Sequence, residues 1–369
     1  MSAVNRFIQR RALPGVLPPL AGVQHPVLQR LYISRGITDI RELERGAAAL
    51  LPYPTAIEQT EAYFDLKLGL TIKVPADNPL LQAAAGRFTA RLGRRAGFDI
   101  PLFASQPVLL KLTGQPAATG AVPLPDMTEQ YHLRVTKTEI ILSAATETGI
   151  LRGLETLLQL ADNGKIAAVN IKDQPRFSWR GLLLDPARRF LPLPVLKRQI
   201  DIMAAAKLNV LHLHLTDDQG WRFESKHFPK LQQIGGADGF YTQAELKQLV
   251  TYAAERGIRV VPEIDLPGHT TALGAAYPEF MSQPGPATPE QHWGVHPAVL
   301  DPTNKQLYPF LRQLLAEVAD VFPDPYLHIG GDEVLGVGAP TGRVVGLEVS
   351  ILRVMGSYPT QWTSLYVLV

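Results

Sequence analysis

The sequence contains no cysteine, so it can form neither a disulfide bond, nor a thiolate metal site, nor a cysteine nucleophile. It also has no apolar run of the roughly 20 residues that a membrane-spanning helix needs. Neither sign of charge is in marked excess, because 36 basic and 34 acidic residues give a formal net charge of +2. The two kinds are mostly interspersed. The sequence thus offers no broad electrostatic surface for nucleic acid or a membrane, and it predicts a small ligand without strong charge.

An export signal is also missing from the start of the sequence. The segment MSAVNRFIQRRALPGVLPPLAG has early positive charge, but prolines and glycines interrupt the place where an unbroken apolar stretch would lie. We therefore expect no signal peptide, and a cytoplasmic location by default. The 369 residues, of which 46% are hydrophobic and 19% charged, are enough for two or three folded domains.

The first half of the chain predicts two segments. Residues 1–54 are Pro-rich and then show helical spacing, which predicts a helical N-terminal extension. Residues 55–172 predict a smaller α+β domain, with strands such as FDLKLGLTIKV and YHLRVTKTEIILSA between amphipathic stretches such as LLQAAAGRFTARLGRRAG and ETGILRGLETLLQLA. This domain has no clustered carboxylates or histidines, so we expect it to have a supporting role.

Within the extension, residues 27–53, VLQRLYISRGITDIRELERGAAALLPY, resemble the extreme N-terminus of bacterial single-strand-specific exonucleases of the DHH phosphoesterase group. The resemblance includes none of that group's metal-binding aspartates and histidines. We therefore expect no nuclease activity from it.

Residues 173–333 alternate apolar, β-rich runs with helical ones. The strand candidates are 180–185, 209–216, 258–265 and 326–332, and the helix candidates between them are 193–207, 242–257 and 305–322. Nearly continuous apolar strands separated by helices predict an α/β fold with a parallel sheet that helices cover.

The position of the polar residues separates two such folds, a doubly wound sheet and a (β/α)8 barrel. Asp185, Asp217, Asp265 and Asp332 stand at the ends of the four strands, and a barrel gathers its catalytic residues at that edge. No glycine-rich phosphate loop follows the first strand, which weakens the nucleotide-binding alternative. The sequence thus favours the first four units of a TIM-type (β/α)8 barrel, preceded by the smaller α+β domain.

The most informative segment is HIGGDE, residues 328–333. Two glycines allow close approach of a ligand, and Asp332 and Glu333 are adjacent acids at a strand end. An isolated acid pair of this kind is more often a solvated turn. Here, however, RGLLLDPARRF at 180–190, HLHLTDDQGW at 212–221 and PEIDLPGH at 262–269 precede YLHIGGDEV at 326–334. In this order, the four segments closely resemble the β-N-acetylhexosaminidases of glycoside hydrolase family 20, and the resemblance covers residues of about 60–334.

The resemblance implies removal of terminal N-acetylhexosamine from β-linked glycosides, without a cofactor. In this family the 2-acetamido oxygen of the substrate acts as nucleophile, so no carboxylate nucleophile is needed. Glu333 is then the general acid and later the general base. Asp332 holds the acetamido N–H, stabilises the cationic ring, and favours the protonated form of its neighbour.

Five further residues are expected to take supporting roles, three of them by resemblance and two, Asp265 and Asp185, because they stand at strand ends. Arg188 grips the outer hydroxyls of the terminal sugar, for which a guanidinium fork suits. Asp217 and His269 form a hydrogen-bonded relay toward the general acid. Asp265 and Asp185 orient neighbouring groups or bind the sugar. His212 and His214 are expected to serve packing and buried hydrogen bonds.

Three alternatives remain open. The histidines and aspartates of these segments could hold a metal, although the flanking residues match a metal-free hydrolase. The chain could be a non-catalytic carbohydrate-binding remnant, or, from residues 27–53, a DNA-processing protein. Because only 36 residues follow Glu333 and residues 334–369 form a tail unlike the family, we also expect this half-barrel to have little or no hydrolase activity alone. The sequence leaves the preferred linkage and the oligomeric state undetermined.

Overall fold

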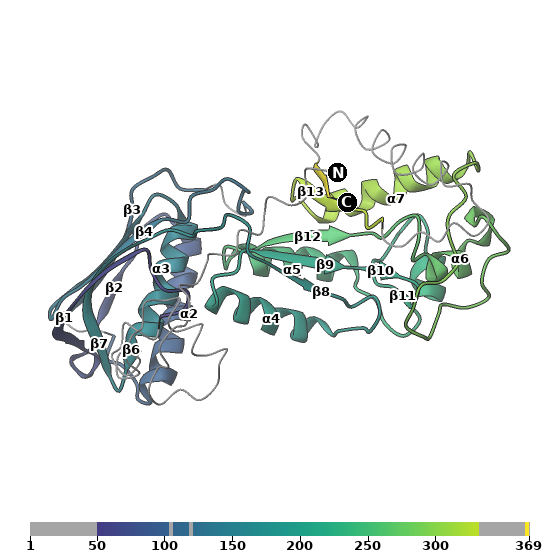
Figure 1. Cartoon of the computed structure of the whole chain (residues 1–369). Helices are drawn as coiled ribbons and strands as arrows, with labels where there is room; N and C mark the ends of the chain where they lie inside the picture. The colour runs from purple at the N-terminus through teal and green to yellow at the C-terminus, as the bar shows by residue number, and fades with distance from the viewer. Residues whose placement is uncertain (1–49, 103–105, 118–120, 332–365, 369) are drawn as a thin grey trace, which may run out of the picture.

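The structure, a computed structural model, describes residues 50–102, 106–117, 121–331 and 366–368. Two β-sheets, each with its own helices, form two lobes that lie side by side in Figure 1. Each lobe has a separate cluster of buried hydrophobic side chains. The predicted helical extension, residues 1–54, lies almost entirely outside the described residues.

The N-terminal lobe is a seven-stranded mixed sheet with two helices. Its strand order is β1-β7-β4-β5-β3-β2, with β6 paired to β7. The strands are β1 (Ala56–Asp65), β2 (Thr71–Lys73), β3 (Pro107–Leu112), β4 (Tyr131–Val135), β5 (Ile140–Ala144), β6 (Ala161–Asp162) and β7 (Lys165–Asp173). The helices α2 (Pro79–Ala96) and α3 (Glu147–Leu160) bury apolar side chains in one cluster with those of the sheet.

Two strand predictions in this lobe need correction. The stretch FDLKLGLTIKV is not one strand, because a 3-10 helix at Leu66–Leu68 separates β1 from β2. The Asp65 side chain accepts a hydrogen bond from the Lys67 backbone N–H, and Gly69 follows at φ 76°, a conformation that ends an extended strand. The stretch YHLRVTKTEIILSA is likewise an antiparallel pair, β4 and β5, rather than one strand.

The C-terminal lobe contains the four predicted strands, in parallel and in the order β14-β13-β12-β9-β8. They are β8 (Gly181–Leu184), β9 (Val210–His214), β12 (Arg259–Glu263) and β13 (Tyr326–His328); β14 (Tyr366–Leu368) adds to β13 in parallel. The predicted helices are α4 (Leu193–Ala205), α5 (Gln243–Ala254) and α7 (Leu307–Val321). The pair β10 (Thr216–Asp217) and β11 (Gly220–Trp221), a π-helical turn Leu231–Gly235, α6 (Thr271–Ala276) and a 3-10 turn Pro278–Phe280 complete it.

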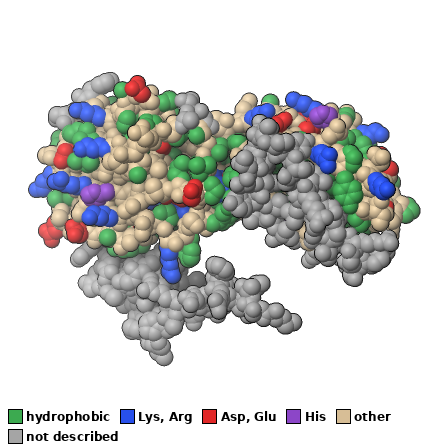
Figure 2. All heavy atoms as spheres, turned by 90° about the horizontal axis from the view of Figure 1, so that it is seen from above, with side chains coloured by type: hydrophobic (Ala, Val, Ile, Leu, Met, Phe, Trp, Pro, Cys, Tyr) green, Lys and Arg blue, Asp and Glu red, His purple; other side chains and the backbone are tan. Residues whose placement is uncertain are grey.

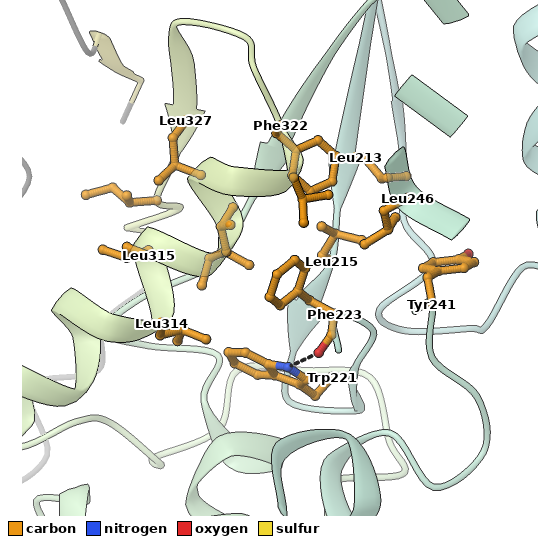
Figure 3. Packing of buried hydrophobic residues seen from close by; sticks show 14 of the residues in the cluster. Leu213, Leu215, Trp221, Phe223, Tyr241, Leu246, Leu314, Leu315, Phe322 and Leu327 are labelled. Carbon is orange, nitrogen blue, oxygen red and sulfur yellow. Dashed lines mark hydrogen bonds between the residues drawn. The ribbon is translucent and has the colours of Figure 1, made fainter. Parts of the chain in front are cut away.

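The two faces of this parallel sheet differ in chemistry. Leu211 and Leu213 of β9 and Leu327 of β13 lie in the hydrophobic core with side chains of α4, α5 and α7. Figure 3 shows part of this core, where the indole of Trp221 also donates a 2.7 Å hydrogen bond to the carbonyl of Phe223. Since neighbouring strand residues point to opposite faces, His212 and His214 lie on the other face. One face is thus an apolar layer against helices, and the other carries polar, titratable groups.

Buried polar contacts join the two lobes. The fully buried guanidinium of Arg152, from α3, donates to the carbonyls of Arg256 and Gly257 at 3.2 and 2.6 Å, just after the end of α5. It also pairs with Glu129 at 2.5 Å, and Arg180, directly before β8, contacts the same carboxylate at 2.6 Å. The N-terminal lobe thereby holds the turn after α5 and anchors a strand of the C-terminal lobe.

On the face drawn in Figure 2, side chains of both charges are dispersed among uncharged surface. Among the described residues, no helix combines the length and the apolar character that crossing a bilayer requires.

Candidate active site

The predicted carboxylates come together at the carboxyl end of the parallel strands. Arg188, in the loop after β8, connects two of them: one guanidinium nitrogen lies 2.7 Å from an oxygen of Asp185, and another lies 2.8 Å from an oxygen of Asp217. About a quarter of the Arg188 side chain is exposed, whereas that of Asp217 is fully buried. The remaining guanidinium N–H groups can therefore reach a ligand while the carboxylates fix the fork.

Asp217 is the centre of this arrangement. Besides Arg188, its carboxylate contacts His214 Nε2 at 2.7 Å and His269 Nδ1 at 3.2 Å, and it accepts a hydrogen bond from the Asp218 N–H at 2.7 Å. Burial alone would raise the pKa of Asp217, but these donors outweigh it and hold that pKa far below its usual range. The carboxylate is therefore charged throughout the neutral range.

His269 is held in an unusual backbone conformation. Its φ of 52° lies in the left-handed region, which side chains with a Cβ seldom occupy and which is concentrated at functional sites. Its Nδ1 lies between Asp217 and Asp218, 3.0 Å from the latter, and these contacts raise the pKa of His269 to about 10. The Asp218 carboxylate is itself held by the N–H and hydroxyl of Thr271 at 3.0 and 2.5 Å. The ring is therefore a fixed cation within the cluster.

The cluster contains a second buried carboxylate, at the end of β12. Glu263 of β12 contacts His212 Nε2 at 2.5 Å, His214 Nδ1 at 2.9 Å and His328 Nδ1 at 3.3 Å. Burial would raise the pKa of Glu263, but the three histidines outweigh it and keep that pKa well below normal. Burial would likewise lower the pKa of His214, yet its bonds to Asp217 and Glu263 raise it to about 10. His214 thus joins the two carboxylates as a charged bridge.

Asp265 has the opposite character. Burial and the nearby charge of Glu263 raise the pKa of Asp265 to about 7. One oxygen accepts a 3.1 Å hydrogen bond from the Gly331 N–H, whereas the other is buried and has no hydrogen-bond partner among the described residues. A Cβ on Gly330, whose φ is 70°, would meet the first oxygen at 1.6 Å, so only glycine fits there. The chain leading to the acid pair is therefore in direct contact with this carboxyl group.

The structure thus brings Asp185, Arg188, Asp217, Asp265 and His269 to one edge of the sheet. Asp332 and Glu333 lie outside the described residues, immediately after the glycines that contact Asp265. The expected contact between Asp217 and His269 is present, but its continuation to Glu333 falls outside the described part of the chain.

Two carboxylates of this cluster were not singled out from the sequence, Asp218 and Glu263. Asp218 is the second acid of the 217–218 pair, and Glu263 lies two residues before Asp265, so a period-2 reading of the strand was the available signal. His214 makes the buried hydrogen bonds that were expected of it, and its two partners are Asp217 and Glu263.

Within the described part of the chain, three groups of side chains have donor atoms close enough together, within 4.8 Å, to surround a metal ion. They are His212, Glu263 and His328; His214, Asp217 and Asp265; and Asp217, Asp218 and His269. In each group a histidine also contacts a carboxylate directly, as His212 does with Glu263, His214 with Asp217 and His269 with Asp218. The same contacts suit an acid–base network.

Two family models match the chain. One, described as glycosyl hydrolase family 20, catalytic domain, matches residues 177–354, and the other, glycosyl hydrolase family 20, domain 2, matches residues 47–174. Together they cover both lobes.

Similar proteins carry related names. A β-hexosaminidase of Akkermansia muciniphila is 42% identical over 56% of this chain and 45% of its own length. A β-N-acetylhexosaminidase of Cellulomonas fimi is 36% identical over 85% of this chain and 65% of its own. The chain therefore spans less than two thirds of the length of either relative.

Solved structures agree in fold and sequence. A chitobiase of Flavobacterium johnsoniae matches 82% of this chain and 47% of its own, with a TM-score of 0.71 and 37% identity. An N-acetyl-β-hexosaminidase of Streptomyces plicatus, in complex with Thio-NAglucal, matches 83% of this chain and 64% of its own, with a TM-score of 0.72 and 30% identity.

Proposed function

The chain belongs to glycosyl hydrolase family 20, and on that premise we propose that it acts in the removal of terminal N-acetylhexosamine from β-linked glycosides, with retention of configuration. The observation that carries the proposal is the cluster in which Asp217 contacts both Arg188 and His269, at the sheet edge where Asp265 binds the Gly331 N–H just before Asp332 and Glu333 in the sequence. A sugar needs a polar fork for its hydroxyls and an acid for its leaving oxygen, and the two would stand side by side here.

The proposal includes a finer fold and domain organisation. Residues 173–333 form the first four units of a TIM-type (β/α)8 barrel, and residues 55–172 form the α+β domain before it. One sheet face is apolar and packs on helices, while the other carries Glu263 and its three histidines. That asymmetry supports a barrel wall with a polar interior over a doubly wound sheet, which would have helices and apolar side chains on both faces.

The reaction needs one acid and the substrate itself. Glu333 gives its proton to the glycosidic oxygen while the acetamido oxygen attacks the anomeric carbon, so the carbon–oxygen bond breaks and an oxazolinium ring forms. The resulting carboxylate then takes a proton from water, and the water oxygen opens the ring at the same carbon. Two inversions give net retention. Asp332 holds the acetamido N–H and stabilises the positive ring.

The described cluster supplies binding and orientation. The exposed part of the Arg188 fork donates to the outer hydroxyls of the terminal sugar, held in place by Asp185 and Asp217. The Asp217–His269 pair orients the acid, and Asp265 acts at the same edge on the sugar or on its neighbours. No cofactor is part of the proposal.

The test compares two variants on two aryl N-acetyl-β-glucosaminides, one with a good and one with a poor leaving group. Glu333→Gln should nearly abolish cleavage of the poor leaving group, which needs protonation, and impair the good one less. Asp332→Asn should impair both, because the ring forms in either case. Equal losses for both variants on both substrates would contradict the division of roles.

Both forms of the protein enter this test. The 369-residue chain is assayed beside a version extended with the C-terminal part of the catalytic domain of a relative, and cleavage by either one supports the proposal. An aryl β-glucoside, which lacks the acetamido group, is the control substrate and should not be cleaved. If a folded extended protein binds N-acetylglucosamine but cleaves neither substrate, the chain is a carbohydrate-binding remnant instead.

A further inference from the structure

Trp293 is the most exposed large hydrophobic side chain of the described residues, with 80% of its surface accessible. It lies in the long loop between β12 and α7, and its ring centroid is 5.9 Å from the guanidinium carbon of Arg188. A tryptophan therefore stands in the open beside the residue proposed to hold the sugar. The mechanism given above makes no use of it.

The loop that carries this indole is closed at its base. Met281 and Leu300 form an antiparallel bridge, and the Ser282 N–H donates to the Val299 carbonyl at 2.9 Å. The Leu300 N–H also donates to the Pro267 carbonyl at 3.1 Å, which attaches the base to the segment just before His269.

The tip of the loop is attached to the active-site turn itself. The Glu290 N–H donates to the Asp218 carbonyl at 3.0 Å, and the Gln219 side-chain amide donates to the His292 carbonyl at 2.7 Å. Within the tip, the Glu290 carboxylate contacts His292 and His296 at 3.0 and 3.3 Å. The same turn that positions Asp217 thus fixes the backbone on which Trp293 stands.

Gly294 completes the arrangement. Its φ of 148° is a conformation that glycine adopts easily and other residues seldom do, and it directly follows the tryptophan. The exposed indole therefore stands on a backbone that hydrogen bonds hold in place and that turns at Gly294, so the fold sets its position.

We propose that Trp293 contacts the substrate: its indole forms the outer wall of the sugar site and packs against the carbohydrate ring whose hydroxyls Arg188 holds. The C–H groups on a pyranose face carry slight positive charge, and an aromatic face is negative, so the two attract as a cation and an aromatic ring do. Packing would also shield the hydrogen bonds of Arg188 from water. The inference deepens the proposed function and rests on it for the identity of the sugar.

The test uses the full 369-residue chain, which has four tryptophans and hence four indole N–H signals in a ¹⁵N-correlated NMR spectrum. Trp293→Phe identifies its signal by loss. Titration with N-acetylglucosamine should shift that signal, Trp293→Ala should raise the Kd about tenfold, and Trp293→Phe should restore most of the affinity. Phe177→Ala, which removes an exposed aromatic ring from the linker before β8, is the matched control and should leave the Kd unchanged.

The outcomes separate this proposal from the proposed function. If N-acetylglucosamine binds but the Trp293 signal does not shift and Trp293→Ala keeps full affinity, Trp293 does not contact the sugar, and the proposed function is unaffected. If the indole responds to another sugar and not to N-acetylglucosamine, the contact stands and the proposed substrate is wrong. If no sugar binds the chain, both fall.

Discussion

Replacement of Asp217 by asparagine tests whether the cluster depends on one buried charge. One oxygen of the carboxylate contacts Arg188 and His214, at 2.8 and 2.7 Å, and the other contacts His269 and the Asp218 N–H, at 3.2 and 2.7 Å. An amide has a single acceptor oxygen, so in either orientation its NH₂ group faces two donors, and two of the four contacts are lost.

The size of the effect follows from these contacts. A hydrogen bond to a charged group contributes about 1.5–3 kcal/mol, so two of them amount to about 3–6 kcal/mol. Arg188 keeps Asp185, and His214 keeps Glu263, which favours the lower end of that range. We therefore expect Asp217→Asn to lower the free energy of unfolding by about 3 kcal/mol at pH 7.

The assay is urea denaturation at pH 7 and at a pH below 3.8, with Asp201→Asn as the control. Asp201 also pairs with an arginine, Arg256, but its side chain is 53% exposed, so its loss should cost less than about 1 kcal/mol. Because the pKa of Asp217 is depressed in the folded state, its contribution is present above its usual pKa of 3.8 and disappears as the pH falls further. Equal, small losses for both variants at pH 7 would refute the reasoning.

Two other perturbations have opposite expected signs. Since burial raises the pKa of Asp265 from its usual 3.8 to about 7, the protein loses stability as the pH rises from 3.8 toward 7, where only the unfolded state gives up the proton, and the loss is complete above 7. Asp265→Asn should abolish this loss, so denaturation at pH 5 and pH 8 should show a larger gain for the variant at pH 8, and equal gains would contradict the shift. Arg152→Met removes a fully buried guanidinium that pairs with Glu129 and binds the turn after α5, and should cost about 3–5 kcal/mol in urea denaturation. The control Arg91→Met, at a more exposed pair, should cost less than about 1 kcal/mol, and similar losses would refute the role of Arg152 in joining the lobes.

The parallel strands and their helices were predictable because their signals are local. In β9, Val210, Leu211 and Leu213 give the strand its apolar, β-favouring character, and the helices before and after it have clear periodicity. The division of FDLKLGLTIKV was missed because it depends on one side-chain cap and one glycine at positive φ, which leave the apolar pattern intact.

The site was only partly predictable for a different reason. The sequence locates Asp185, Asp217 and Asp265, because each stands at the end of a predicted strand and the ends of parallel strands lie at one edge of the sheet. The convergence of three histidines on Glu263, in contrast, depends on the register between β9, β12 and β13, which pairs residues about 50 and 65 positions apart. A single sequence carries no signal for that register.

The central claim, that the chain recognises a terminal N-acetylhexosamine with Arg188 on its outer hydroxyls and Asp332 on its acetamido group, is tested most directly by calorimetric titration of N-acetylglucosamine and of glucose into the 369-residue chain and its Arg188→Lys variant. The acetamido contact predicts binding of N-acetylglucosamine in preference to glucose. Because lysine keeps the charge but not the two-pronged fork, the account also predicts a Kd at least about tenfold higher in the variant. Equal affinity for the two sugars, or an unchanged Kd in a folded Arg188→Lys protein, would contradict it.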